Sequence, residues 1–138
     1  MLACVHAIAE RATQRGIVSA YHPNSPDESI YRTANDYSVL LAGLNDRLGW
    51  VPDIGHIERA GIDSLALLKD HRELVRHIHY KDMNKDRTWA EMGHGAIDFL
   101  AITRFLMDTG YSGWIVVEDE SDRAIPDPDQ VTIDDWSW

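Results

Sequence analysis

The chain has little with which to build a disulfide framework, a nucleic-acid surface or a membrane span. Cys4 is the only cysteine among 138 residues, so no intrachain disulfide can form and a reducing compartment is expected. The 13 basic residues face 23 acidic ones, and the formal charge of -10 disfavours nucleic acid and anionic membranes as partners. No apolar run reaches the roughly 20 residues of a membrane helix, and the N-terminus lacks the basic and apolar regions of a signal peptide. These absences favour a cytoplasmic location.

What is present is a regular alternation of helix-like and strand-like segments. A composition of 44% hydrophobic and 26% charged residues is typical of one globular domain with its own core. Apolar periodicity and capping residues predict helices over 2–15, from Thr33, from Asp63 and from Asp98. Apolar runs predict strands at 17–22, 48–53, 76–82 and 114–118. We expect an α/β domain of about four βα units with parallel strands over residues 1–125, followed by a C-terminal tail, 126–138, without strong periodicity.

Polar side chains follow three of these strands, at the point where each one ends. The run Trp50-Val51-Pro52 stops at Asp53, and Gly55 is expected to let the backbone turn so that His56 returns to the same place. Alternation in the 76–82 strand puts His79 on one face, and Glu118 follows the last strand directly. Strand ends that carry carboxylate and imidazole side chains are typical of a metal site at the top of an α/β barrel.

Each of these three residues also has a purely structural interpretation. His79 could be a hydrogen-bonded core histidine, Asp53 a helix cap, and Glu118 an exposed carboxylate in the acidic run 118–120. The coincidence of three strand ends favours the site over these alternatives. Other residues are as easily structural as substrate-contacting: His22, Lys81 and His94. Asp119 and Glu120 are expected to be solvated, and the 93–95 Gly-His-Gly loop to meet a phosphate or hydroxyl through backbone N–H groups.

The length of the chain sets a limit on this fold. A complete (β/α)8 barrel typically needs roughly 250 residues. The 138 residues present here therefore correspond to about half of one.

Four segments together resemble the C-terminal half of the xylose isomerase-like TIM barrel superfamily, which includes sugar phosphate isomerases and epimerases, inosose dehydratases and endonuclease IV-like enzymes. The resemblance covers roughly residues 15–125 and is specific for the superfamily, although not for one substrate. The segments are Trp50–His56, His77–Asp82, Gly93–Phe99 and Gly113–Glu118.

The resemblance implies a divalent metal (Mn, Mg, Co or Zn) held at the ends of barrel strands 5 to 8. Asp53, His79 and Glu118 match the ligands of the last three strands. The strand 5 ligand of the family is a glutamate, and the nearest register places Arg32 there, which leaves His22 or Glu28 as substitutes.

The implied function is that of a metal-dependent isomerase or epimerase acting on a sugar or sugar phosphate through an enediolate. Glu118 would be a metal ligand and catalytic base, and His56 would orient a substrate oxygen, with Lys81 and His22 as further substrate-binding residues. An inosose-type dehydratase is the alternative, and a non-catalytic half-barrel fragment is a third possibility. The expected small-molecule ligand is a sugar or polyol.

A half-barrel is also expected to associate. Its two outer strands, 17–22 and 114–118, would each have an unpaired edge, and Val51, Trp114 and Val116 would face an incomplete interior. We therefore predict a homodimer, or a requirement for the missing N-terminal half.

Overall fold

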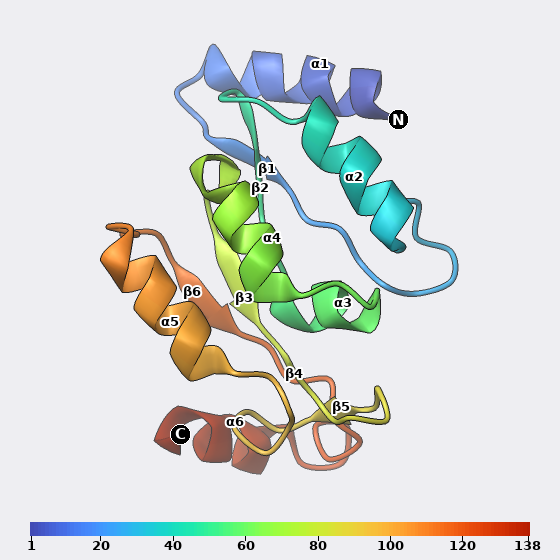
Figure 1. The fold of residues 1–138 in the computed structure, drawn as a ribbon, viewed down its shortest axis with the longest axis vertical. Helices are drawn as coiled ribbons and strands as arrows, with labels where there is room; N and C mark the ends of the chain where they lie inside the picture. The colour runs from blue at the N-terminus through green and yellow to red at the C-terminus, as the bar shows by residue number, and fades with distance from the viewer.

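Four short strands, each preceded by a helical segment, organise the chain. The computed structural model describes residues 1–138 (Figure 1). The strands that carry the fold are β1 (Ser19–Tyr21), β2 (Leu48–Trp50), β3 (Ile78–Tyr80) and β6 (Ile115–Val117). A small hairpin is formed by β4 (Asp82–Met83) and β5 (Trp89–Ala90). The helices are α1 (Leu2–Thr13), α2 (Ala34–Gly43), α3 (Ile54–Arg59), α4 (Ser64–Asp70), the 3-10 turn η1 (Arg72–Leu74), α5 (Phe99–Asp108) and α6 (Pro128–Ser137).

The four main strands lie in the order β1-β2-β3-β6, and all of them run in parallel. β1 pairs with β2 and β3 pairs with β6, each in parallel register. Parallel bridges from Trp50 to Val75 and from Asp53 to His79 join the two pairs, with a 2.9 Å hydrogen bond from His79 N–H to the Pro52 carbonyl. The expected parallel α/β arrangement is confirmed, and the carboxyl ends of all four strands reach the same edge.

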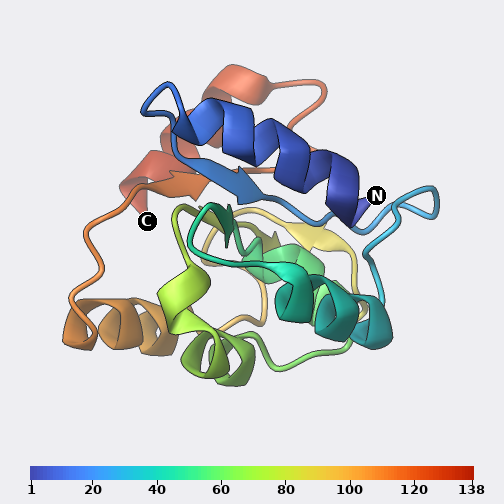
Figure 2. The ribbon, with the colours of Figure 1, turned by 90° about the horizontal axis from the view of Figure 1, so that it is seen from above.

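The core lies between this sheet and the helices along one of its faces. Helices α2, α4 and α5 stand side by side along that face (Figure 2). The side chains of Trp50, Leu40, Leu68 and Ile78 are fully buried there. Phe99 and Ile102 of α5 are each only 2% exposed. At about 25 cal/mol per Å² of apolar area, this cluster is the main stabilising term of the fold.

The helix starts follow the predicted capping chemistry. The Thr33 hydroxyl accepts a hydrogen bond from the Asp36 N–H, and the Asp36 carboxylate accepts one from the Thr33 N–H, forming a complete capping box. Asp63 and Asp98 cap α4 and α5 in the same way through the N–H groups of Ala66 and Ala101. Each cap satisfies a backbone donor that would otherwise lack a partner.

Three local features differ from the sequence-based expectation. Gly55 is not a turn residue but lies in α3, where a Cβ would come within 2.7 Å of the Lys81 carbonyl oxygen, so close packing accounts for the glycine. The loop after residue 82 contains the β4–β5 hairpin. The C-terminal tail is largely helical, because Asp127 caps α6 and Trp138 packs edge-on against Phe99 at 5.9 Å between ring centroids.

None of these helices is long and apolar enough to cross a membrane.

Candidate metal and substrate site

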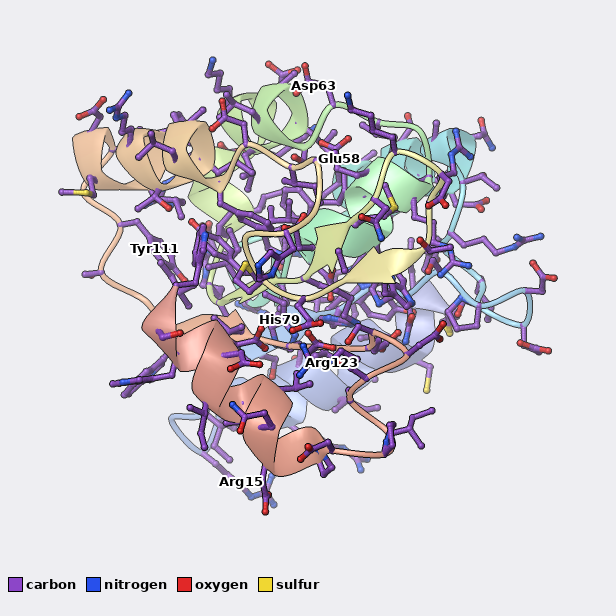
Figure 3. The ribbon with its side chains drawn as sticks, turned by 90° about the horizontal axis from the view of Figure 1, so that it is seen from below. Arg15, Glu58, Asp63, His79, Tyr111 and Arg123 are labelled. Atoms are coloured by element: carbon purple, nitrogen blue, oxygen red, sulfur yellow. The ribbon has the colours of Figure 1, made fainter.

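Four side chains, one within or shortly after each of the four main strands, converge on one point. His22 follows β1, Asp53 follows β2, His79 lies within β3 and Glu118 follows β6. Each contributes a nitrogen or oxygen atom, and these four atoms lie within 4.8 Å of one another. His79 lies near the middle of the molecule when it is seen from below (Figure 3). The structure therefore brings together the three residues that the sequence suggested as metal ligands, and adds His22 to them.

Asp53 combines the two roles that the sequence left as alternatives. Its Oδ1 accepts a 3.0 Å hydrogen bond from the His56 N–H and so caps α3. Its Oδ2 is fully buried and has no hydrogen-bond partner, with His22 Nε2 and Lys81 Nζ each 3.6 Å away. Burial alone would raise the pKa of Asp53, but His22, His56 and Lys81 outweigh burial and hold this pKa below its ordinary value. One oxygen of a buried carboxylate is thus left free to bind a cation.

His22 occupies the position for which the sequence had no clear candidate. Its Nε2 is buried and also lacks a hydrogen-bond partner, although it faces Asp53 Oδ2. Arg32 lies elsewhere and pairs with Asp27 at 2.8 Å, and Glu28 is exposed and outside the cluster. Two buried polar atoms that face each other across 3.6 Å without a hydrogen bond are an arrangement that a bound cation would satisfy.

His79 and Glu118 form the more exposed half of the cluster. His79 Nδ1 and Glu118 Oε2 are 2.8 Å apart, and the two side chains are 21% and 37% exposed. Burial would raise the pKa of Glu118, yet the hydrogen bond to His79 and the charge of Lys81 lower it overall, so the carboxylate is ionised at neutral pH. Glu118 is therefore both charged and accessible.

Lys81 is buried among the carboxylates of the site. Its side chain is 1% exposed, and its Nζ lies 2.7 Å from Glu120 Oε1, 3.2 Å from Glu118 Oε1 and 3.6 Å from Asp53 Oδ2. Burial would lower the pKa of Lys81, but these carboxylates raise it overall and keep the ammonium group charged. The expectation that Glu120 is merely solvated is wrong, because this partner stabilises the buried charge of Lys81.

His56 lies against the same cluster and is almost completely enclosed. Its Nδ1 is 2.8 Å from the Ser25 hydroxyl, and its Nε2 is 3.3 Å from Lys81 Nζ. The pKa of His56 is lowered to about 4, mainly by burial. The charge of Asp53 opposes this shift and the charge of Lys81 adds to it, so the imidazole is neutral at pH 7. Ser25 was not identified from the sequence, because a serine in a Pro-containing loop carries no signal for a contact 31 residues away.

The Gly-His-Gly loop is organised by a carboxylate rather than prepared for a phosphate. The buried Asp82 accepts hydrogen bonds from the N–H groups of Gly93 and Gly95 at 3.1 and 2.9 Å, and from Met83 at 2.8 Å. A phosphate contact through the glycine N–H groups is excluded by this arrangement, because both donors already have a charged partner. His94, between them, is exposed and lines a separate surface cavity.

The donor set fits a divalent transition metal. Two imidazoles and two carboxylates suit Mn, Co or Zn, while Mg would favour more oxygen ligands. The unpartnered His22 Nε2 and Asp53 Oδ2 supply a structural reason for an ion at this point. Lys81 contributes one positive charge to the three carboxylates around it, which leaves the cluster with negative charge for a cation to balance.

Comparison with known proteins places this arrangement in a family context. Residues 1–138 match the model for the xylose isomerase-like TIM barrel. An inosose dehydratase from Lacticaseibacillus casei is 27% identical over 88% of this chain, and the rhizopine catabolism protein MocC from Rhizobium meliloti is 31% identical over 83%. These alignments cover 46% and 40% of the two relatives, so the chain spans about half their length.

Among solved structures, the Escherichia coli 3-keto-D-glucoside 4-epimerase YcjR superposes on 99% of this chain with a TM-score of 0.75. The superposition uses 51% of that protein, at 22% sequence identity. This likeness demonstrates the fold, and its extent agrees with a partial barrel.

Proposed function

Since the chain belongs to the xylose isomerase-like TIM barrel family, we propose that it carries the metal site of an enzyme that removes a proton next to the carbonyl group of a sugar or keto-polyol. The observation that carries this proposal is the convergence of His22, Asp53, His79 and Glu118 within 4.8 Å, with two of the atoms unpartnered. His22, Asp53, His79 and Glu118 would hold the ion. A divalent ion bound there would polarise a substrate carbonyl group.

The side chains around this point have defined proton roles. Glu118 is ionised and accessible, so its carboxylate can accept the proton that leaves the substrate carbon. Lys81 is a charged donor held by Glu120, and it would hydrogen-bond a substrate oxygen that carries partial negative charge. His56 is neutral and fixed between Ser25 and Lys81, so it would position Lys81 and orient the substrate.

Two reactions share this first step. Return of the proton to the opposite face of the same carbon gives an epimerase, and its delivery to the former carbonyl carbon of the enediolate gives an isomerase. Expulsion of a neighbouring hydroxyl group, which leaves as water, gives a dehydratase. The curated relatives favour the dehydratase, because two sequence matches at 27% and 28% identity are inosose dehydratases. The epimerases are related at the level of fold. Supplying a keto-polyol in D2O separates the two: an epimerase yields a deuterated isomer, and a dehydratase yields a product lighter by one water.

Removal of the donor atoms tests the metal site directly. Bound divalent metal should be lost in each of the variants His79→Ala, His22→Ala and Glu118→Gln. Each variant keeps only three of the four ligands, and loss of one ligand lowers metal affinity by orders of magnitude. Asp53→Asn is the better substitution at that position, since the amide oxygen keeps the cap on α3. Metal content by mass spectrometry of the purified proteins is the measurement.

His94→Ala is the matched control, since His94 is exposed and lies outside the cluster. Circular dichroism would establish that each variant is folded. Undiminished metal content in all four site variants would refute the assignment.

We further propose that residues 1–125 form the barrel part and that they associate with a second half, supplied either by another copy of the chain or by further barrel strands. The support is that the chain spans about half the length of its relatives, and that β1 and β6 each lack an outer neighbour. Unpaired strand edges are templates for association.

A further inference from the structure

A row of hydrogen-bonding side chains runs from the loop after β1 to the centre of the metal cluster. The Ser25 hydroxyl is 2.8 Å from His56 Nδ1, and His56 Nε2 is 3.3 Å from Lys81 Nζ. The same Nε2 lies 3.7 Å from Asp53 Oδ2, the buried oxygen that has no hydrogen-bond partner. The position of the proton on the His56 ring therefore determines whether that oxygen is left free.

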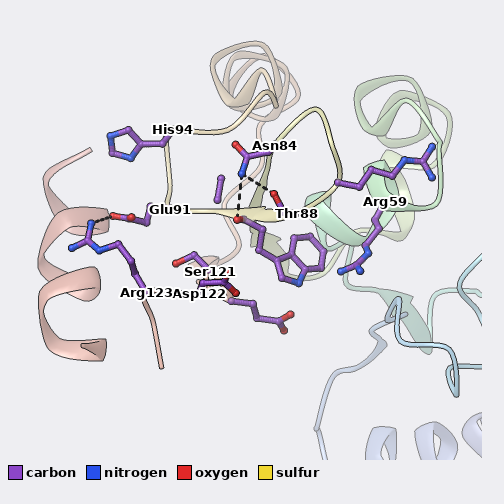
Figure 4. A pocket seen from close by; sticks show the side chains of 12 residues that line it. Arg59, Asn84, Thr88, Glu91, His94, Ser121, Asp122 and Arg123 are labelled. Carbon is purple, nitrogen blue, oxygen red and sulfur yellow. Dashed lines mark hydrogen bonds and ion pairs between the residues drawn. The ribbon is translucent and has the colours of Figure 1, made fainter. Parts of the chain in front are cut away.

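The His56 ring is enclosed, so each of its nitrogens depends on a partner within the protein. The side chain is only 2% exposed. Trp89 packs edge-on against the ring, with 5.3 Å between the ring centroids. Trp89 also lines the surface cavity that His94 lines, whereas His56 is not part of that lining (Figure 4). Solvent in the cavity thus meets the indole, and the imidazole is paired inside the protein.

Lys81 determines which ring nitrogen of His56 is the acceptor. An ammonium group has three N–H donors and no lone pair, so it can only donate to the nitrogen that it faces. A proton on Nε2 would place two donors against each other across 3.3 Å. A ring protonated on both nitrogens would do the same and would add a second buried cation. Nε2 is therefore unprotonated and accepts from Lys81, and the ring proton lies on Nδ1.

Ser25 supplies the acceptor that a proton on Nδ1 requires. The His56 Nδ1–H donates to Ser25 Oγ at 2.8 Å, and this hydroxyl is the hydrogen-bond partner of Nδ1 in the structure. His56 already carries a proton on the nitrogen that faces the hydroxyl, so it cannot remove a proton from Ser25, and the pair is not an activated nucleophile. The role of Ser25 is to keep a buried N–H group paired.

The other tautomer of His56 has an acceptor close by. A proton on Nε2 would point to Asp53 Oδ2, which is unpartnered and 3.7 Å away, just beyond hydrogen-bond range. A small movement of the ring would close that distance. The Nε2–H group would then occupy the oxygen that faces the cation site, and it would repel the ammonium group of Lys81.

We infer that Ser25 is a positioning residue for the metal site, and that it acts by fixing the tautomer of His56. By accepting the Nδ1 proton, it keeps the Nε2 lone pair directed at Lys81 and leaves Asp53 Oδ2 free for the ion. The inference rests on the proposed function and adds a control of metal affinity to that site. The loop after β1 thereby provides one ligand, His22, and governs the availability of another.

The tautomer of His56 is measurable by NMR on the metal-free chain labelled with nitrogen-15 histidine, because protonated and bare ring nitrogens have well-separated chemical shifts. His56→Gln assigns the signals by their absence. The wild-type chain should show the Nδ1–H form, and Ser25→Ala should convert His56 largely to the Nε2–H form. Ser25→Thr retains the hydroxyl and should retain the wild-type tautomer. Ser29→Ala is the matched control, since Ser29 lies in the same loop and its side chain forms no hydrogen bond.

The affinity for Zn²⁺ is the second readout, measured by calorimetry on variants whose folding is checked by circular dichroism. Ser25→Ala should raise the Kd roughly tenfold, because the ion then competes with an N–H group for Asp53 Oδ2. Ser25→Thr and Ser29→Ala should keep the wild-type Kd. The inference is overturned if wild-type His56 carries its proton on Nε2, or if Ser25→Ala leaves either the tautomer or the Kd unchanged.

The two readouts keep this inference separate from the proposed function. His79→Ala should lose zinc and keep the wild-type tautomer of His56, because His79 is not a partner of that ring. A wild-type chain that binds no zinc would refute the metal site itself. A wrong tautomer in a chain that binds zinc would refute the role of Ser25 and leave the metal site in place.

Discussion

The centre and the edges of the sheet are built from similar residues but have different surroundings. In the central strands, Trp50 and Ile78 are fully buried. At the β6 edge, Trp114, Ile115 and Val117 are 78%, 41% and 44% exposed. Apolar composition is therefore not what separates the two regions. Central strands have a strand on each side, while edge strands have one neighbour and a free row of backbone groups.

The same division runs through the candidate site. Asp53, from the centre, is fully buried, whereas His22 and Glu118, from the edges, are 29% and 37% exposed. The centre thus provides a fixed carboxylate, and the edges provide ligands that remain reachable by a substrate. The expectation that Val51 faces an open interior is wrong, because Val51 is 9% exposed, but Trp114 is as exposed as expected.

The largest expected effect is on stability, and it contrasts two tryptophans. Trp50→Ala should lower the free energy of unfolding by roughly 3–5 kcal/mol, because it removes a large side chain from the packed core. Trp114→Ala should change it by less than about 1 kcal/mol, since that side chain is mostly in water. Urea unfolding followed by circular dichroism measures both. Equal losses would mean that the edge is covered in solution.

A smaller effect is expected of pH on the free energy of unfolding, through the buried His56. The folded chain holds the pKa of His56 at about 4, while an unfolded histidine titrates near 6.5. Between these values the unfolded chain binds a proton that the folded chain does not, so stability is complete above pH 6.5 and is lost as the pH falls toward 4. The contribution is on the order of 3 kcal/mol.

His56→Gln should flatten the dependence of unfolding free energy on pH within this window, as measured by urea unfolding at several pH values. The exposed His94→Gln variant is the control and should keep the wild-type slope. A wild-type slope in His56→Gln would mean that His56 is not enclosed as the structure describes.

The smallest effect concerns association at the edge. We expect the chain to self-associate at micromolar concentration, and Ile115→Lys should raise the dissociation constant roughly tenfold, because a charge on an edge strand opposes strand pairing. Light scattering over a dilution series measures this. Val39→Lys, on the outside of α2 and 53% exposed, is the matched control. A monomeric wild-type chain that unfolds cooperatively would contradict the proposed association with a second half.

Much of the fold was predictable, because its signals are local. Thr33, Asp63 and Asp98 cap their helices as predicted, since a cap depends on a side chain and a backbone group three residues apart. The helix that follows Thr33 buries its apolar residues Tyr37, Leu40 and Leu41, in agreement with the apolar periodicity that predicted it. Helix α6 was missed because its apolar residues form no regular stripe, and Trp138 docks on Phe99 through a contact that sequence spacing does not reveal.

The residues of the candidate site also divide into those that local sequence predicted and one that only the structure identified. Asp53 and Glu118 were recognisable because each follows an apolar run, and His79 because alternation places it on the polar face of its strand. Parallel strands bring their carboxyl ends to one edge. His22 was one of two substitutes for the absent glutamate, and only the structure distinguishes it from Glu28.

Local sequence patterns were enough to predict the starts of the helices at Thr33, Asp63 and Asp98, the four main strands, and the ligand-type side chains on three of those strands, because these properties depend on neighbours within a few positions. Only the packing of the chain shows that Glu120 stabilises the buried Lys81 and that Asp82 accepts the hydrogen bonds of the glycine N–H groups in the 93–95 loop. These outcomes depend on distances between segments far apart in the chain. Such distances are set by how the strands and helices pack together, which periodicity and spacing do not encode.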